Sequence, residues 1–191
     1  MTRFVSWVTA GLLVSALPLC AQAQGLPQPN SRFGPVLEAA AEFGGDNVVK
    51  VFYTNGDTQD IRAGQGVTLS GGLHYQLAQL PLDIAATVGY KFVTTSDYHT
   101  DLGIHRVVLK LTGTYELPRH FWLDAGPVWH TAVKVSGDGY LPDINLNDAV
   151  GVTVGAGWRW FGVTYTAIRY TSPVTNGVNA DNVGVTATWK F

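Results

Sequence analysis

The sequence is short of the features that stabilise small secreted domains and of those that mark a helical membrane protein. Its 191 residues include one cysteine, Cys20, which lies in an N-terminal segment with the character of a leader. The rest of the chain can therefore form neither a disulfide nor a thiolate metal site. After that segment no run of about 18 apolar residues occurs, so a membrane-spanning helix is not expected. Such a chain depends on its own core, or on lipid, for stability.

Charge is scarce as well. Charged residues make up 14% of the chain and no basic run stands out, which argues against a nucleic-acid partner. Hydrophobic residues nevertheless make up 46%, and the mean hydropathy is positive. High apolar content without a membrane helix is typical of a membrane β-barrel, whose strands alternate lipid-facing apolar residues with polar residues that face the interior.

The N-terminal segment predicts a secretory signal peptide, residues 1–23, that is cleaved. Arg3 supplies the positive charge, residues 4–19 are mostly apolar, and Ala21-Gln22-Ala23 forms a small-x-small cleavage site. Lipid attachment at Cys20 would need a small residue before it, whereas Leu19 stands there. We therefore assign Cys20 to the discarded leader.

Removal of the leader leaves 168 residues with 11 basic and 14 acidic side chains, a length that suits one domain. Residues 24–35 are rich in Pro, Gln, Asn and Gly, and we expect them to form a flexible lead-in. Residues 36–191 are expected to form a single β-barrel domain.

Strand patterning is clearest at residues 183–191, where apolar and polar side chains alternate. Successive strand residues point to opposite faces, so Val185, Ala187 and Trp189 share one face while Thr186 and Thr188 share the other. The same pattern predicts eight strands along the chain. They are residues 36–43, 66–77, 82–92, 104–117, 121–135, 149–159, 162–170 and 181–191.

The predicted connections alternate in length. The short ones are residues 78–81, 118–120 and 160–161, and the long ones are residues 44–65, 93–103, 136–148 and 171–180. Outer-membrane barrels have short periplasmic turns and longer extracellular loops. The sequence therefore predicts an all-β fold, an eight-stranded antiparallel up-and-down transmembrane barrel. Within the first long loop, Asn55-Gly56 predicts a type I′ turn between the arms of a β-hairpin, residues 48–54 and 57–63.

Two predictions concern single strands. Pro127 lies on the apolar face of strand 121–135 and cannot donate a ladder hydrogen bond, so we expect a bulge or kink there. The facing of strand 162–170 is ambiguous. We favour Arg169 inside, because a charge that faces lipid near the middle of the membrane costs about 2–4 kcal/mol.

Aromatic residues gather near the ends of the predicted strands, where amphipathic rings favour the membrane interface. We therefore expect two aromatic girdles. The girdle at the short-turn end comprises Tyr75, Tyr115, Phe121, Trp158, Trp160, Trp189 and Phe191, and the girdle at the long-loop end comprises Tyr90, Phe92 and Tyr170.

The leader-like segment, the eight strands and the final Trp189-Lys190-Phe191 resemble the small eight-stranded outer-membrane β-barrel superfamily, which includes OmpA-type and OmpX-type barrels. The resemblance covers residues 24–191 but is one of pattern. It implies a location in the outer membrane of a Gram-negative bacterium, contact with lipid and lipopolysaccharide, and assembly by periplasmic chaperones and the barrel assembly machinery. It does not imply one activity, because members of the superfamily differ in function.

The polar faces of the strands predict a structural network inside the barrel. An eight-stranded barrel is just wide enough for its side chains to fill it, and a buried unpaired ion costs several kcal/mol, so charges of both signs should pair. We expect Glu38 and Glu42 to meet Lys110 or Arg106 across the interior. The predicted network comprises Glu38, Glu42, Lys91, Arg106, Lys110, Glu116, Asp124, His130, Lys134 and Arg159.

Three functions remain open from the sequence. The first is a structural or envelope-interaction role, in which the barrel anchors loops that contact lipopolysaccharide or external partners. The second is a small pore or a binder of small apolar molecules, because inward-facing glycines such as Gly151, Gly155 and Gly157 remove side-chain volume. These glycines also ease strand curvature and sheet coiling, and we favour that explanation.

The third is a lipid A-modifying enzyme that uses His130 and Ser136. Barrel deacylases carry a His-x-Ser-Asn arrangement, whereas His130 is followed by Thr131-Ala132-Val133, so the pattern fails at the nucleophile. We therefore expect no catalytic, cofactor or metal site, and we expect the protein to be a monomer.

Overall fold

The computed structural model describes residues 33–52, 58–77, 80–97, 100–137, 141–172 and 175–191. The predicted signal peptide, residues 1–23, and most of the predicted lead-in lie outside these residues. Apart from one 3₁₀ turn, Pro118–His120, the regular structure in the described residues consists of strands. No helix among them has the length and apolar character needed to cross a membrane.

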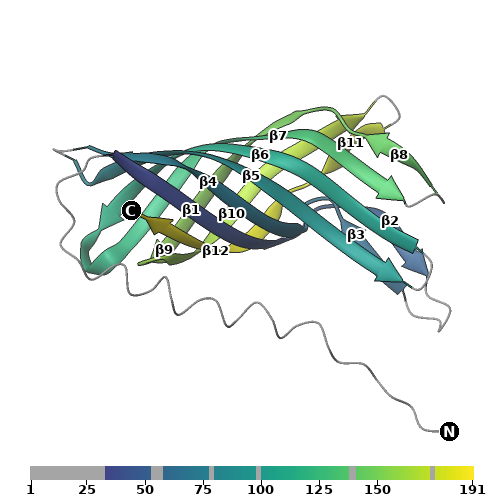
Figure 1. Ribbon diagram of the computed structural model, residues 1–191, viewed down its shortest axis with the longest axis horizontal. Coiled ribbons are helices and arrows are strands. Elements are labelled where there is room, and N and C mark those ends of the chain that lie inside the picture. The colour runs from purple at the N-terminus through teal and green to yellow at the C-terminus, as the bar shows by residue number, and fades with distance from the viewer. Residues whose placement is uncertain (1–32, 53–57, 78–79, 98–99, 138–140, 173–174) are drawn as a thin grey trace, which may run out of the picture. The chain divides into compact units, whose positions relative to one another are not determined.

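Eight antiparallel strands form a closed barrel (Figure 1). They are β1 (Phe33–Phe43), β4 (Gly66–Gln76), β5 (Leu82–Asp97), β6 (Thr100–Leu117), β7 (Phe121–Gly137), β9 (Ala149–Trp158), β10 (Phe161–Ser172) and β12 (Asn182–Lys190). Each strand pairs with the next, and β1 closes the ring by pairing with β12. The predicted fold is confirmed. The first strand begins at Phe33, so the predicted lead-in, 24–35, overlaps its first three residues.

Four shorter strands lie at the long-loop end. They are β2 (Asn47–Phe52), β3 (Thr58–Arg62), β8 (Leu141–Asn145) and β11 (Thr175–Asn179). The β2–β3 pair is the hairpin expected in the first long loop, although its turn, 53–57, lies outside the described residues. Strand β8 pairs with β7, and β11 pairs with β10. The long loops are therefore partly β-structured.

The outer face of the barrel is an apolar belt. Side chains such as Leu69, Val88 and Val152 are more than half exposed, whereas their inward-facing neighbours in sequence are largely buried. Aromatic residues at the edges of this belt are also exposed, among them Tyr75 at the short-turn end and Tyr90 at the long-loop end. Exposed aromatic residues therefore occur at both ends of the barrel, but Tyr170 is not among them. It is 1% exposed and faces the interior.

A bulge in β7 changes which side chains face the interior. Ala132 has φ 51°, and the β6–β7 register shifts beside it, between the pairs His105↔Lys134 and Val107↔Thr131. One extra residue in a strand inverts the facing of those that follow. Beyond the bulge, Val133 is therefore buried and Lys134 is exposed. Of the bulge or kink expected at Pro127, the bulge is wrong, because the register is the same on both sides of that residue.

Strand β10 has the opposite facing from the one we expected. Ile168 and Tyr170 are buried inside the barrel, whereas Arg169 is exposed. Arg169 pairs with Asn179 of β11, beyond the segment of β10 that pairs with β9 and β12. The side chain therefore lies at the long-loop end and not near mid-membrane, so the cost of facing lipid that motivated the prediction does not apply there.

Candidate functional site: the barrel interior

The interior at the short-turn end is closed by side chains of the barrel strands. Asp83, on β5, is 2% exposed. Its carboxylate accepts a hydrogen bond of 2.7 Å from Nδ1 of His74 on β4 and lies 3.0 Å from Nζ of Lys190 on β12. These three side chains point into the barrel from their strands and meet there. The two partners compensate the cost of burying the Asp83 carboxylate.

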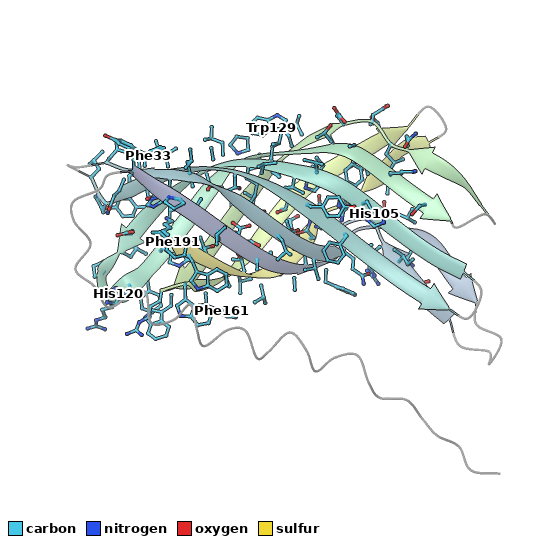
Figure 2. All side chains as sticks on the ribbon, in the orientation of Figure 1. Phe33, His105, His120, Trp129, Phe161 and Phe191 are labelled. Atoms are coloured by element: carbon cyan, nitrogen blue, oxygen red, sulfur yellow. The ribbon has the colours of Figure 1, made fainter. Side chains whose placement is uncertain are left out.

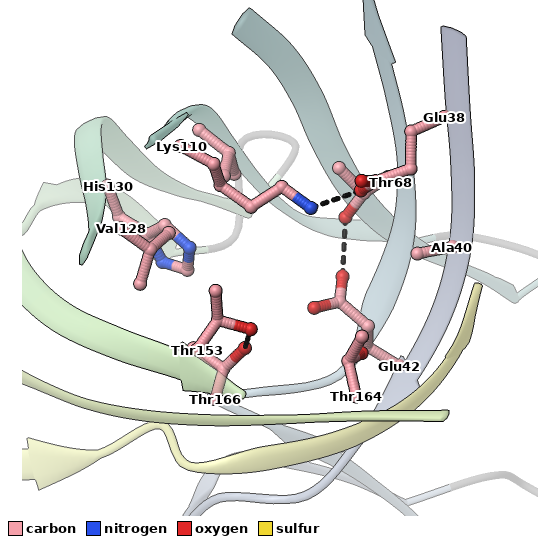
Figure 3. Close-up of a pocket in the computed structure, with 11 residues that line it drawn as sticks. Glu38, Ala40, Glu42, Thr68, Lys110, Val128, His130, Thr153, Thr164 and Thr166 are labelled. Atoms are coloured by element: carbon pink, nitrogen blue, oxygen red, sulfur yellow. Dashed lines mark hydrogen bonds and ion pairs between the residues drawn. The ribbon is translucent and has the colours of Figure 1, made fainter. Parts of the chain in front are cut away.

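The middle of the interior is bridged by Glu38 on β1 and Lys110 on β6, which form an ion pair. Lys110 reaches across the barrel toward Glu38 in Figure 3. Asp124, on β7, lies against Gly155 of β9: a Cβ at that glycine would fall 2.2 Å from Asp124 Oδ1. This glycine therefore makes room for a charged side chain.

A second ion pair lies nearer the long-loop end. Lys91 is fully buried, and its Nζ lies 3.1 Å from the carboxylate of Glu42, which also accepts a hydrogen bond from Thr68. Lys91 donates in addition to the carbonyl of Gly64, 2.7 Å away. Glu42 thus pairs with Lys91, and not with Arg106 or Lys110 as the sequence analysis expected.

Arg106 binds backbone and a phenol instead of a carboxylate. It is 1% exposed and donates to the carbonyls of Ala63 and Gln65, the latter at 2.7 Å. It also donates to the hydroxyl of Tyr170 at 2.9 Å, which leaves the hydroxyl proton for Nδ1 of His130 at 2.5 Å. These hydrogen bonds link β6, β7 and β10 to the segment that precedes β4.

Residues 61–65, here named the cap segment, fold into the barrel mouth. Ile61 is 1% exposed and packs with Ile104 and Val135 on the inner faces of β6 and β7. Ala63 is buried with Tyr170 in a neighbouring apolar cluster. The cap segment therefore closes the long-loop end by apolar packing and by carbonyls that accept from Lys91 and Arg106.

Between these layers lies a small cavity of about 20 Å³, room for one or two water molecules. Figure 3 shows its lining, with Lys110 and His130 on one wall and Glu38 and Glu42 on the other. The full lining is Glu38, Ala40, Glu42, Thr68, Val108, Lys110, Val128, His130, Thr153, Thr164 and Thr166. Because the walls are rich in donors and acceptors, the cavity suits ordered water.

Several inward glycines are explained by close contacts. A Cβ at Gly184 would meet the Glu42 side chain at 2.7 Å, and one at Gly157 would meet the Trp122 ring at 2.3 Å. At Gly151 the obstacle is the Ala167 carbonyl, at 2.3 Å. These positions accommodate neighbouring side chains and backbone, so the missing side-chain volume does not open a path.

The structure corrects three members of the predicted network. Lys134 faces outward because of the bulge at Ala132. Arg159 lies in the turn after β9, where its guanidinium stacks 4.6 Å above the Trp158 ring. Glu116 is exposed because it lies at the short-turn rim, one residue from the end of β6. The other seven face the interior.

The two residues considered for enzymatic chemistry do not come together. His130 points inward to Tyr170, whereas Ser136 follows the bulge on the outer face and donates to the Gly103 carbonyl at 3.4 Å. They form no nucleophile–base pair. Among the residues that the structure describes, no group of three His, Cys, Asp or Glu side chains could hold a metal ion.

Sequence reasoning missed Tyr170 and the backbone of the cap segment. The sequence places Tyr170 in the outer girdle, because an aromatic residue at a strand end has no feature that marks it as buried. Backbone acceptors carry no side-chain signature at all. The signal that could have identified the cap segment is the glycines around it: Gly44, Gly45 and Gly66 adopt φ values of 144°, 85° and 151°, which permit the chain to turn inward.

The described residues form a closed eight-stranded antiparallel β-barrel with an apolar outer belt and a filled interior, features that are typical of small outer-membrane barrels. No protein-family model and no curated protein matches the chain.

The solved structures similar to it include the following two. One is the N-terminal β-barrel domain of OprF from Pseudomonas aeruginosa, with 10% identity and a TM-score of 0.32 over 83% of this chain and 98% of that chain. The other is Ail, the attachment invasion locus protein of Yersinia pestis, in complex with the heparin analogue sucrose octasulfate. It has 10% identity and a TM-score of 0.36 over 82% of this chain and 97% of that chain. The strand pairing of the chain itself establishes the barrel.

Proposed function

We propose that the protein resides in the outer membrane of a Gram-negative bacterium, where a closed barrel anchors loops for contact with lipopolysaccharide or external partners. The observation that carries the proposal is the filled interior. Buried ion pairs occupy the short-turn end and the middle of the barrel, a further pair lies nearer the long-loop end, and the cap segment occupies the mouth there. A barrel filled in this way suits an anchor better than a conduit.

The loops support the same role. Strands β2, β3, β8 and β11 give the long-loop end a defined backbone, so the surface it presents is more ordered than a set of free loops. The proposal includes cleavage of residues 1–23 and assembly by periplasmic chaperones and the barrel assembly machinery, with the monomer as the functional unit. N-terminal sequencing of the membrane-extracted protein should begin at Gln24.

The first test is insertion and conductance. The chain without residues 1–23, refolded into phospholipid vesicles, should migrate on a gel at different positions before and after heating. In planar bilayers it should produce no conductance steps, because the interior is filled. Stable conductance steps from the inserted protein would contradict the anchor hypothesis and favour a pore. A protein that stays in water and never enters lipid would contradict the proposed membrane location.

The second test concerns lipopolysaccharide. The unfolding temperature should be higher in vesicles that contain lipopolysaccharide than in vesicles without it. A variant with residues 141–145 of β8 replaced by a Gly-Ser segment of equal length should show a smaller rise, because the ordered loop surface is reduced. An equal unfolding temperature in both kinds of vesicle would argue against this partner.

Within the part of the chain that the structure describes, neither alternative function has a matching site. Pockets for small molecules hold about 300–1,000 Å³, whereas the interior cavity holds about 20 Å³. For the enzyme hypothesis, His130 and Ser136 face opposite sides of the sheet. Lipid A from cells with and without the protein should therefore have the same mass spectrum.

A further inference from the structure

Two turns at the short-turn end hold cationic or ionisable residues in a backbone conformation that side chains avoid. Arg119 and His120, between β6 and β7, have φ of 64° and 65°, and Arg159, between β9 and β10, has φ of 54°. Glycine is favoured in this region because a Cβ collides with the backbone there. Such residues gather at binding sites, where function requires the side chain despite the strain.

The two turns are fixed side by side by hydrogen bonds. The backbone N–H of Arg159 donates to the carbonyl of His120 at 2.8 Å. The indole N–H of Trp158 donates to the carbonyl of Arg119 at 3.1 Å, and that of Trp122 donates to the carbonyl of Arg159 at 2.8 Å. The two arginines therefore belong to one ordered surface.

The charges on this surface are turned outward. Arg119 and Arg159 are exposed, and the ion pairs found between described residues involve neither of them. The guanidinium of Arg159 lies 4.6 Å above the Trp158 ring. This differs from the barrel interior, where Lys91 and Lys110 each meet a carboxylate.

The surface lies where the apolar belt ends. Phe121, Trp158 and Phe161 are each about half exposed and adjoin the two turns in sequence. Figure 2 shows His120 and Phe161 at the same end of the barrel, away from His105. A cation beside exposed aromatic rings at this level would meet the headgroup region of a bilayer.

We propose that Arg119 and Arg159 bind the phosphate of an anionic phospholipid, with Trp158 and Phe161 against its glycerol and acyl chains. The guanidinium group suits this ligand because its planar fork can donate two hydrogen bonds to one phosphate. This inference rests on the proposed membrane function. It names anionic phospholipid as the ligand at the periplasmic rim, whereas lipopolysaccharide is the proposed partner of the long loops at the other end.

The test compares lipid binding to the folded, detergent-solubilised protein by native mass spectrometry. The wild type should prefer phosphatidylglycerol over phosphatidylcholine of the same chain length. In the double variant Arg119→Gly/Arg159→Gly, the preference for phosphatidylglycerol should fall about tenfold or more. Both arginines attract anionic lipid, and the variant removes both charges. Its melting temperature should stay equal or rise, because glycine relieves the left-handed backbone.

Arg169→Gln is the matched control, since it removes one exposed positive charge at the long-loop end and should leave the preference unchanged. The site is overturned if the folded double variant keeps the wild-type preference, or if Arg169→Gln reduces the preference as much. Failure of the protein to enter lipid at all would instead count against the proposed membrane function, so the two failures are distinguishable.

Discussion

The two halves of the barrel interior are filled by different kinds of contact. At the short-turn end and in the middle, side chains of barrel strands pair with one another, as Glu38 does with Lys110 and Asp83 with Lys190. At the long-loop end, Arg106 and Lys91 donate to backbone carbonyls of the cap segment. Ile61 of that segment packs with Ile104 in an apolar cluster.

The short-turn half of the interior is thus closed by side chains of the sheet, whereas the long-loop half is closed by a loop. The first kind is complete once the eight strands have paired, because alternation alone brings the charged groups together. The second kind also requires residues 61–65 to turn back into the mouth. We therefore expect the long-loop half to open at lower free energy than the short-turn half, since local opening follows the least supported contacts.

The largest effect is expected where the two kinds of contact meet. Glu42→Ala leaves the buried Lys91 with the Gly64 carbonyl and without its carboxylate. Removing one partner of a buried ion pair destabilises a protein by about 3–5 kcal/mol. Urea unfolding in vesicles, followed by tryptophan fluorescence, should show this loss together with a lower unfolding temperature.

The control for Glu42→Ala is the double variant Glu42→Ala/Lys91→Met, which removes both charges. Because no buried ion then lacks a partner, most of the lost stability should return. Equal instability of the single and the double variant would show that packing, and not charge, accounts for the loss.

A smaller and more local effect is expected for Arg106→Met. The substitution leaves the carbonyls of Ala63 and Gln65 and the Tyr170 hydroxyl without their donor, at a cost of about 2–3 kcal/mol. Hydrogen exchange of the amides of residues 61–65 should become faster, while those of β4 near Leu73 stay protected. Equal acceleration in both places would contradict the separation of the two halves.

The facing of side chains along the barrel strands could be predicted from the sequence to a greater degree than the contacts of the cap segment, although the inward facing expected for Glu116 and Arg159 at the short-turn rim is wrong. Up to Ala132, a period of two places the side chains of β7 correctly, and the same holds along β1 for Glu38 and Glu42. Beyond Ala132 the extra residue inverts the facing, and no residue type announces it. Contacts from Arg106 to backbone carbonyls could not be predicted either, because every residue has a carbonyl.

Substitution of Lys134 should have the smallest effect on the free energy of unfolding, in contrast to substitution of Glu42. By alternation alone Lys134 would lie among the interior charges, and its removal would then cost as much as that of a buried partner. In the structure its side chain is exposed beyond the Ala132 bulge. Because contacts of exposed charges contribute little, Lys134→Gln should change the unfolding free energy by less than about 1 kcal/mol in the same urea assay. A loss of unfolding free energy as large as that of Glu42→Ala would indicate that Lys134 lies inside the barrel, and would contradict the bulge at Ala132.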